Sequence, residues 1–489
     1  MKHCIKQAWV AWLLMPVLFS CATYNSKMSA YYKQVSASHY RHADHMLERN
    51  GYLQHPRNSL LYYMERGQML HLQGLYDSSN LFLNLADLYI ENKHKSLGNA
   101  ITSLMLNPMT VPYLGEDFER FMVHYYKALN YLYLGKTDDA LVEARRISLS
   151  TQTQEDKFKP GANRYTKDAF ALNVQGMIYE AAGMINDAFI AYRNAADVYL
   201  KEPNNRYYGV AIPSQLKQDV LRTAALMGFN DQLDFYGKKF NTTYKSRDSS
   251  NAGGELVVFF ERGMAPAKTE QNFILAQSGD GNGVFVFNGP YGTFDIPFDV
   301  SSANSSAASL KNFRTIRVAI PIYEPRSYNN VQGTITADGA AYSSELAEDI
   351  NTIAPAVLKE RIVKEVSNAL LRQAFKLGME KGASEATKAA VKNNSKEKDA
   401  GKKERNAEAA ALVTGLVVNM FNTATEKADT RNWQSLPAYI QYVRVPLKKG
   451  TNDIRLQLGN AEKTIRIEGK TGLQLYNWRV PDNSITVAP

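Results

Sequence analysis

Histidine and cysteine, the side chains most often used for metal binding and nucleophilic catalysis, are confined to the first part of this sequence. The last of its eight histidines is His124, and its two cysteines are Cys4 and Cys21. The C-terminal half therefore lacks the residues for Ser-His-Asp or Cys-His catalysis and for most zinc sites. No HExxH, GxSxG or phosphate-binding loop motif occurs anywhere in the chain.

Two local patterns could bind a metal ion. His39, His42 and His45 are spaced three apart, so neighbouring pairs could meet on a helix, but all three meet poorly on one face. The turn at 280–283 is similar to a calcium loop but lacks the later bidentate Glu. We expect an exposed helix and a β-hairpin there, with no metal and no cofactor.

Carboxylates are the remaining candidates for catalysis. Glycoside cleavage needs two carboxylates whose separation is set by the fold and not by sequence spacing. Glu255, Glu261 and Asp295 are the candidates in the C-terminal region. They support an alternative reading of the chain as an envelope hydrolase acting on glycan or peptide.

The N-terminus carries a pattern typical of export. Lys2 and Lys6 precede an apolar stretch over residues 8–19 that is too short to span a membrane. The stretch ends in Leu18-Phe19-Ser20-Cys21, which resembles a lipobox. The resemblance implies a lipoprotein signal peptide over residues 1–20 and attachment of fatty acid, such as palmitate, to the Cys21 thiol. A simple secretory signal is the alternative.

The residues around Cys21 bear on location. Removal of residues 1–20 leaves Cys21 as the sole cysteine, so the exported chain has no internal disulfide. Ala22 stands where inner-membrane lipoproteins carry Asp, and the next residues contain no acidic cluster. We expect an outer-membrane lipoprotein facing the periplasm, with residues 21–58 forming the anchor and a leading helix.

Residues 59–240 repeat a helical pattern. The clearest copy resembles a tetratricopeptide repeat (TPR), with small residues where two helices approach closely and aromatic residues between them. Over all copies, the positions expected to pack helix on helix are Gly67, Gly74, Ala86, Ala128, Gly135, Ala140, Gly176, Tyr179, Gly183, Ala188, Tyr192 and Ala195. Two amphipathic helices without repeat ancestry are the alternative.

The spacing of the repeats is irregular. The turn glycines Gly74, Gly135, Gly183 and Gly228 are 61, 48 and 45 residues apart, longer than the usual 34 or so of this repeat type. We therefore expect an irregular α-solenoid whose concave groove binds a partner protein.

A polar linker at 241–254 leads into a different kind of sequence at 255–489. Alternating or continuous apolar runs predict strands at 255–260, 283–287 and 315–323, with 331–337 as the neighbour of the third. They also predict an antiparallel meander over 440–445, 453–458, 463–468 and 473–478. The fold class expected for the whole chain is α+β: the solenoid, then a mixed domain with antiparallel strands.

Residues 343–429 are expected to form an inserted or covering helical layer. A helical stripe over 345–378 is interrupted by Pro355, and a lysine-rich stretch at about 384–405 follows. The apolar stretch 407–421 is too short to cross a membrane comfortably. A core helix is favoured there; a membrane-inserted helix and a helix that pairs two subunits stay open.

Charge argues against nucleic acid as a partner. The formal net charge is +9, and removal of Lys2 and Lys6 gives +9 − 2 = +7. Residues 388–405 contribute seven basic and three acidic side chains, a net of +4, which is typical of a solvated linker. The repeats themselves show no basic stripe.

The order of these features resembles an uncharacterised family of bacterial envelope lipoproteins with TPR-like N-terminal halves. The resemblance rests on the lipobox, the irregular repeats, the run Gly253-Gly254-Glu255-Leu256-Val257-Val258 and the run from Asp429 to Pro437. It implies location and architecture and transfers no active site. The function expected is a lipid-anchored, non-catalytic scaffold whose partners are a membrane, unidentified envelope proteins and, through the β-rich part, a second protein or the cell wall.

Overall fold

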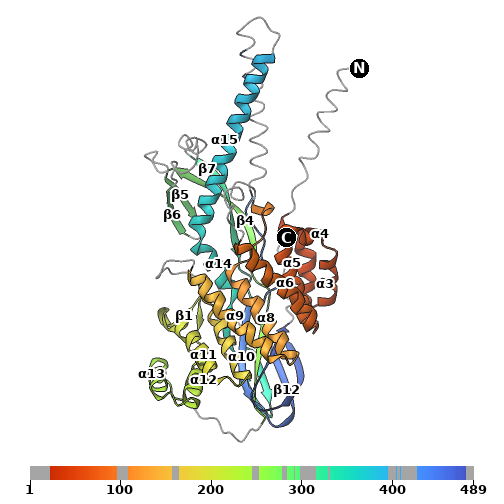
Figure 1. Ribbon diagram of the computed structural model, residues 1–489, viewed down its shortest axis with the longest axis vertical. Coiled ribbons are helices and arrows are strands. Elements are labelled where there is room, and N and C mark those ends of the chain that lie inside the picture. Colours follow the sequence, from red (N-terminus) through yellow and green to blue (C-terminus); the bar gives the residue numbers. More distant parts are fainter. Residues whose placement is uncertain are drawn as a thin grey trace.

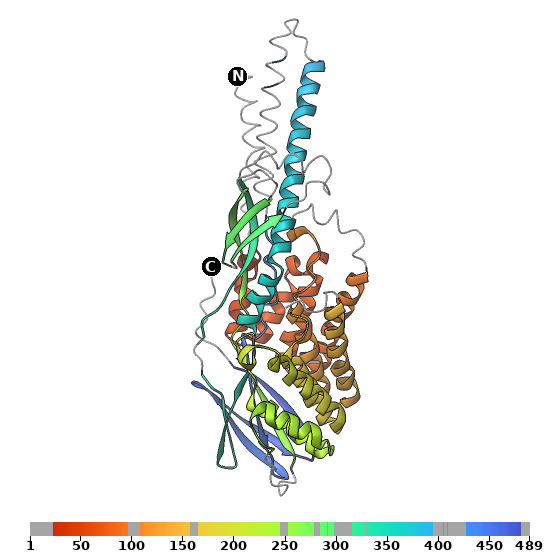
Figure 2. The same ribbon diagram turned by 90° about the vertical axis from the view of Figure 1, so that its left-hand side faces the viewer.

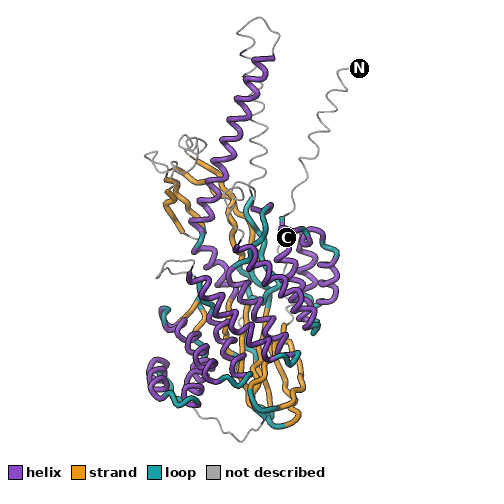
Figure 3. Tube along the Cα trace, viewed as in Figure 1, coloured by secondary structure: helices purple, strands orange, loops and turns teal. Residues whose placement is uncertain are grey.

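The computed structural model describes residues 23–95, 108–156, 165–244, 253–277, 284–290, 292–297, 315–328, 331–394 and 427–480, with Glu404 and Glu408. The chain is helical in its first half and strand-rich in its second, so the fold is α+β (Figure 3). Outside the described residues lie the predicted signal peptide at 1–20, Cys21, the apolar stretch 407–421 apart from Glu408, the turn at 280–283, and parts of the linker and of the lysine-rich stretch.

The helical half is built largely from antiparallel hairpins. Its helices are α2 (Tyr24–Ser36), α3 (Tyr40–Glu48), α4 (Gly51–Gln54), α5 (Ser59–Leu72), α6 (Tyr76–Lys95), α8 (Asp117–Tyr133), α9 (Thr137–Asp156), α10 (Ala169–Ala181), α11 (Ile185–Leu200), α12 (Ser214–Leu226) and α13 (Asn230–Phe240). The turns of α5/α6, α8/α9, α10/α11 and α12/α13 each contain a glycine at positive φ. Only glycine adopts this conformation at little cost, so the glycine fixes the turn.

The strands form three four-stranded sheets. They are β3 (Glu255–Arg262), β4 (Ala267–Gln277), β5 (Val284–Gly289), β6 (Gly292–Pro297), β7 (Thr315–Glu324), β8 (Thr334–Ala337), β9 (Ala340–Ser343), β10 (Glu345–Asp349), β11 (Tyr439–Pro446), β12 (Gly450–Leu458), β13 (Ala461–Gly469) and β14 (Leu473–Val480). The first sheet has the order β10-β11-β3-β14, the second β13-β12-β8-β9, and the third β6-β5-β4-β7. A short hairpin, β1 (Arg206–Tyr207) and β2 (Val210–Ala211), joins α11 to α12.

Strand pairing departs from the predicted meander. Strands β12 and β13 do form an antiparallel hairpin, but β14 pairs in parallel with β3, and β11 lies between β3 and β10. Strand β3 is apolar on both faces, which suits a central position with a neighbour on each side. The prediction that 331–337 neighbours 315–323 was wrong, because β8 pairs with β9 and β12.

The helix predicted over 345–378 begins later, at Ile350, and its interruption lies at Arg361, between α14 (Ile350–Glu360) and α15 (Ile362–Asn394). Residues Glu345–Asp349 form the edge strand β10, and Asp349 caps the next helix by accepting from the amide of Thr352. Helix α14 runs through Pro355, so the predicted interruption at this proline was wrong, although Pro355 has no N–H to donate within the helix. Helix α15 follows and packs on the third sheet before it extends away from the body (Figures 1 and 2).

The core crosses from one half of the chain to the other. Phe259 of β3 packs against Tyr125 and Phe170 of the helical half, with ring centres 5.7 and 5.9 Å apart. Its neighbours Val258 and Phe260 point the other way and pack on the second sheet. Alternate side chains of β3 point to opposite faces of the first sheet. The first sheet therefore lies between the helices and the second sheet.

None of the described helices is long and apolar enough to span a membrane.

Candidate functional site

The inner face of the helical hairpins is occupied by the chain itself. Residues 427–438, here called the Trp433 segment, run between α5, α8 and the first sheet. Trp433 is 0% exposed; its amide donates to Glu119 at 2.6 Å and its indole N–H to Gln68 at 3.1 Å. The surface predicted to bind a partner protein is covered at this point.

Arg431 ties the same segment to the start of the helical half. The side chain is fully buried and donates to Asn58 Oδ1 at 2.9 Å and to the carbonyl oxygen of Pro108 at 3.0 Å. Asp429 balances its charge at 2.7 Å. A buried guanidinium with these partners fixes the path of the segment.

Glu65 holds the Trp433 segment from α5. Its carboxylate accepts from Tyr31 and Tyr32, both at 2.8 Å, and from Ser435. No cation is among these partners. Burial therefore raises the pKa of Glu65 from 4.5 to about 7, although the three hydroxyl donors lower it in part.

Two further carboxylates at the start of α8 differ sharply in environment. Burial and the neighbouring charge of Glu116 raise the pKa of Glu119 to about 7. Burial also opposes ionisation of Glu116, but the adjacent Arg361 and Lys268 lower its pKa to about 2. Glu116 thus links α8 to β4 and to the junction of α14 and α15.

The carboxylates proposed for hydrolysis are not brought together. Glu255 pairs with Arg444, whereas Glu261 is buried and accepts from Tyr125 and Tyr126. The two lie six residues apart on one strand, roughly 20 Å, beyond the roughly 5–9.5 Å of glycosidase pairs. Asp295 lies on β6 in a different sheet.

The three spaced histidines do not converge either. His39 precedes α3 and contacts Gln34 at 3.0 Å, while His45 contacts Glu48 at 3.1 Å. His42 is exposed on α3.

A different group of metal-binding side chains is buried between α6, α8 and α9. Ligand atoms of Asp87, His124 and Glu143 all lie within 4.8 Å of one another. The ammonium group of Lys127 lies 2.7 Å from Asp87 and 2.8 Å from Glu143. The lysine thus provides the cation that these carboxylates require. His124 and Lys127 lie one turn apart on a buried face of α8. Such polar residues on an apolar helix face were the sequence signal that could have predicted this cluster.

The predicted packing positions lie within the hairpins. Gly67 faces Leu83, and Gly176 faces the ring of Tyr192 so closely that a Cβ would collide with it. Gly74, Gly135 and Gly183 are at the turns, with φ of 78°, 69° and 76°. Tyr179 is half-buried. Fully buried positions are Ala86, Ala128, Ala140, Ala188, Tyr192 and Ala195.

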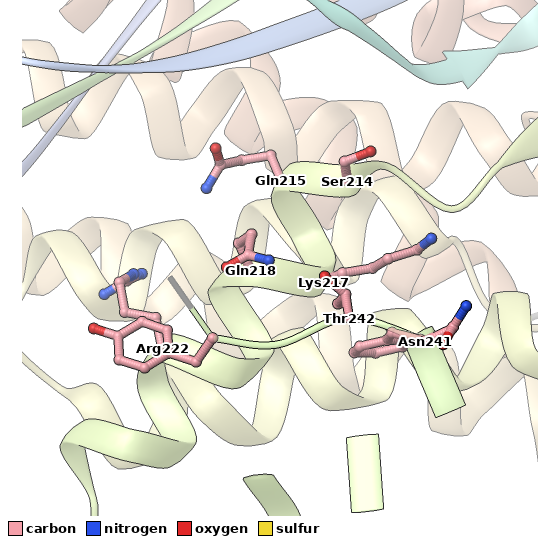
Figure 4. A pocket seen from close by; sticks show the side chains of 9 residues that line it. Ser214, Gln215, Lys217, Gln218, Arg222, Asn241 and Thr242 are labelled. Atoms are coloured by element: carbon pink, nitrogen blue, oxygen red, sulfur yellow. The ribbon is translucent and has the colours of Figure 1, made fainter. Parts of the chain in front are cut away.

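A pocket of about 540 Å³ lies at the far end of the helical half (Figure 4). It is lined by Ser214, Gln215, Lys217, Gln218, Arg222, Phe240, Asn241, Thr242 and Tyr244. None of these nine is a carboxylate, histidine or cysteine, but the backbone amides of Ser214 and Gln215 donate to the nearby carboxylate of Glu345, both at 2.9 Å. Arg222 is already neutralised by Glu180 and Asp219. The nine lining residues offer hydrogen-bond donors and acceptors.

The outer face of the hairpins carries exposed apolar side chains. Leu81, Leu85 and Leu88 follow one another along α6, and Leu81 is 59% exposed. Val142 and Leu149 are likewise exposed on α9, where Leu149 is 60% exposed. An ion pair between Arg146 of α9 and Asp87 of α6 connects the two helices. We call these five residues the outer apolar patch.

Comparison with known proteins gives one slight structural likeness. No protein-family model matches the chain, and no curated protein matches it. Among solved structures, kinesin-light-chain, nearly identical TPR-like repeats from Podosopora anserina align with 13% identity and a TM-score of 0.30. The alignment covers 44% of this chain and 92% of that one.

Proposed function

We propose that the protein is a lipid-anchored, non-catalytic scaffold of the bacterial cell envelope, held through Cys21 in the outer membrane and facing the periplasm. The proposal rests on the contacts that the buried glutamates make. Glu65, Glu119 and Glu261 are each committed to fixed internal donors that hold the fold together. Such acids support a structural body better than a hydrolase, whose acids would face an open cleft.

The anchor fits the start of the folded body. Thr23 caps α2 by accepting from the amide of Ser26, and Tyr24 is already fully buried. An acylated Cys21 would therefore join the folded body with no long linker. Two or three acyl chains would make the attachment effectively permanent.

Partner binding is proposed for the outer face of the hairpins. The inner face is covered by the Trp433 segment and the first sheet, so a partner that used it would have to displace the chain's own core. The outer apolar patch needs no such displacement. Exposed apolar side chains grouped on adjacent helices are a feature of protein interaction sites.

Membrane fractionation tests the anchor. After a wash at high salt, which screens surface charge, Cys21→Ser should release the protein from membranes into the soluble periplasmic fraction without changing its melting temperature. Mass spectrometry of the native N-terminus should show a fatty-acid-bearing cysteine. Membrane attachment of the Cys21→Ser protein that persists at high salt would contradict this part of the proposal and favour the stretch 407–421 as the anchor.

Photo-crosslinking in cells tests the outer apolar patch. A crosslinker at Leu85 should yield one discrete heteromeric product, and Leu81→Glu should abolish it because a charge cannot be desolvated there cheaply. A crosslinker at Thr464, exposed on β13, is the control. Equal products at both positions would count against a partner at the patch.

A further inference from the structure

The outer surface of α2, α3 and α4 carries positive charge. Lys27 and Lys33 of α2, Arg41 of α3 and Arg49 just after it are exposed. Among the described residues no ion pair is recorded for these four cations. We call this surface the basic face. It consists of Lys27, Lys33, Arg41 and Arg49.

Acidic side chains do little to offset this charge. Residues 23–58 contain five Lys or Arg and two acids, a net of 5 − 2 = +3. One acid, Asp44, is buried against Arg66. The other, Glu48, pairs with Arg66 and His45. The four cations of the basic face are therefore available to an external anion.

The fold brings the basic face to the start of α2. The side-chain amide of Asn50 donates to Met28 Sδ at 3.4 Å, and Lys27 Nζ lies 4.4 Å from the ring centre of Tyr52. The end of α3 and the start of α4 thus lie beside the first turn of α2. In Figure 1, α3 and α4 form the outer edge of the molecule, with no other labelled element outside them.

The tether to the proposed anchor is short. Cys21 precedes Thr23 by two residues, which span at most about 7 Å even when fully extended. The start of α2 is thereby held within about one Debye length of the bilayer, which is about 8 Å at physiological salt. This step rests on the proposed lipidation of Cys21.

We propose that the basic face is a membrane-binding surface that lies against anionic phospholipid headgroups of the membrane that holds the anchor. The Lys and Arg side chains bind the headgroup phosphates. The acyl chains hold the protein at the bilayer, and the basic face determines which side of the protein lies against the bilayer.

Vesicle sedimentation of the non-acylated protein tests the surface separately from the anchor. The probe is the full mature chain with Cys21→Ser, mixed at about 0.15 M salt with vesicles of phosphatidylcholine alone or with one-third phosphatidylglycerol. Each cation near an anionic surface is worth about fivefold in partitioning. Replacement of Lys27, Lys33, Arg41 and Arg49 by Gln should therefore lower binding to the anionic vesicles by roughly 600-fold.

The control replaces four other exposed lysines by Gln: Lys201, Lys238, Lys449 and Lys470. It changes the net charge by the same amount and should lower binding by less than about fivefold. Equal losses in both variants would overturn the proposal, because net charge alone would then explain binding. Equal binding to both kinds of vesicle, or binding to heparin as tight as to anionic vesicles, would also overturn it.

The outcomes separate the surface from the anchor. If native Cys21 proves to be unacylated while the Cys21→Ser protein binds anionic vesicles through the basic face, the anchor fails and the surface stands. If Cys21 is acylated but the four replacements change nothing, the anchor stands and the surface fails. Unchanged circular dichroism and melting temperature would show that the variants fold.

Discussion

Two buried glutamates should make the folded chain more stable in mild acid than at neutral pH. Burial raises the pKa of Glu65 and Glu119 to about 7, against 4.5 when exposed. Between these values the unfolded chain has lost the proton and the folded chain still holds it. The free energy of unfolding therefore falls as pH rises from 4.5 to 7, by about 3 kcal/mol for Glu65 alone.

Glu65→Gln should flatten this dependence. An amide keeps the size of the side chain and does not ionise, so the slope between pH 5 and 7.5 should decrease by about one proton. Urea denaturation at several pH values measures the slope, and Glu462→Gln on exposed β13 is the control. Below pH 4.5 the sign reverses, because cations lower the pKa of Glu116 and Glu180 to about 2. An unchanged slope in Glu65→Gln would contradict the assignment.

Lys127 should be indispensable to the cluster that it neutralises. Lys127→Met leaves the buried carboxylates of Asp87 and Glu143 without their ammonium partner, a loss of about 3–5 kcal/mol. The same change frees three ligand atoms that lie within 4.8 Å of one another. Zinc should then raise the melting temperature of the variant and not that of the wild type.

The matched control for this experiment is Lys136→Met, which removes an exposed lysine paired with Asp77. Its stability should change little, and zinc should have no effect on it. A zinc effect of equal size in wild type, Lys127→Met and Lys136→Met would show that the metal binds elsewhere.

At the scale of elements, helix pairs depend on close approach at a few positions. A Cβ at Gly176 of α10 would collide with the ring of Tyr192, which is held in place by its hydrogen bond to Glu180 at 2.7 Å. Gly176→Ala should destabilise the protein by about 1–3 kcal/mol, measured by urea denaturation. Gly51 of α4 has open space around it, so Gly51→Ala should be neutral or slightly stabilising. Equal effects at both positions would refute the close packing.

Elements were predictable from the sequence where their own periodicity defines them. Alternating apolar residues marked the strand at 315–324, and a continuous apolar run marked β3. Pairing was not predictable, because alternation shows which face of a strand is buried and not which strand lies beside it. The parallel pairing of β14 with β3 and the strand character of Glu345–Asp349 depend on contacts distant in sequence.

The buried polar residues were harder to foresee. Glu65 lies on α5 beside Leu61 and Met64, so a carboxylate on an apolar face was the available signal. Its partners Tyr31, Tyr32 and Ser435 come from up to 370 residues away. No local spacing rule connects them. The basic face, by contrast, is visible in composition, and only its position beside the first turn of α2 required the fold.

At the scale of the whole molecule, the hydrophobic core extends across the predicted domain boundary at 241–254. One cluster of buried side chains runs from Tyr24 through the helical hairpins to Leu475 of β14. Phe259 and Trp433 from the C-terminal half lie within it. The division into a repeat domain and a β-rich domain remains a prediction from the sequence. The buried cluster extends across this division, so we expect the two halves of the chain to stabilise each other.

The helices and the first sheet should therefore unfold in a single transition. The four tryptophans are Trp9, Trp12, Trp433 and Trp478, so after removal of residues 1–20 tryptophan fluorescence reports only on the C-terminal half. Far-UV circular dichroism at 222 nm reports mainly on helices. Gly176→Ala lies in the helical half, yet it should shift the fluorescence midpoint in urea by the same amount as the circular dichroism midpoint. A shift confined to circular dichroism would mean that the two halves unfold separately and that the shared core contributes little to their coupling.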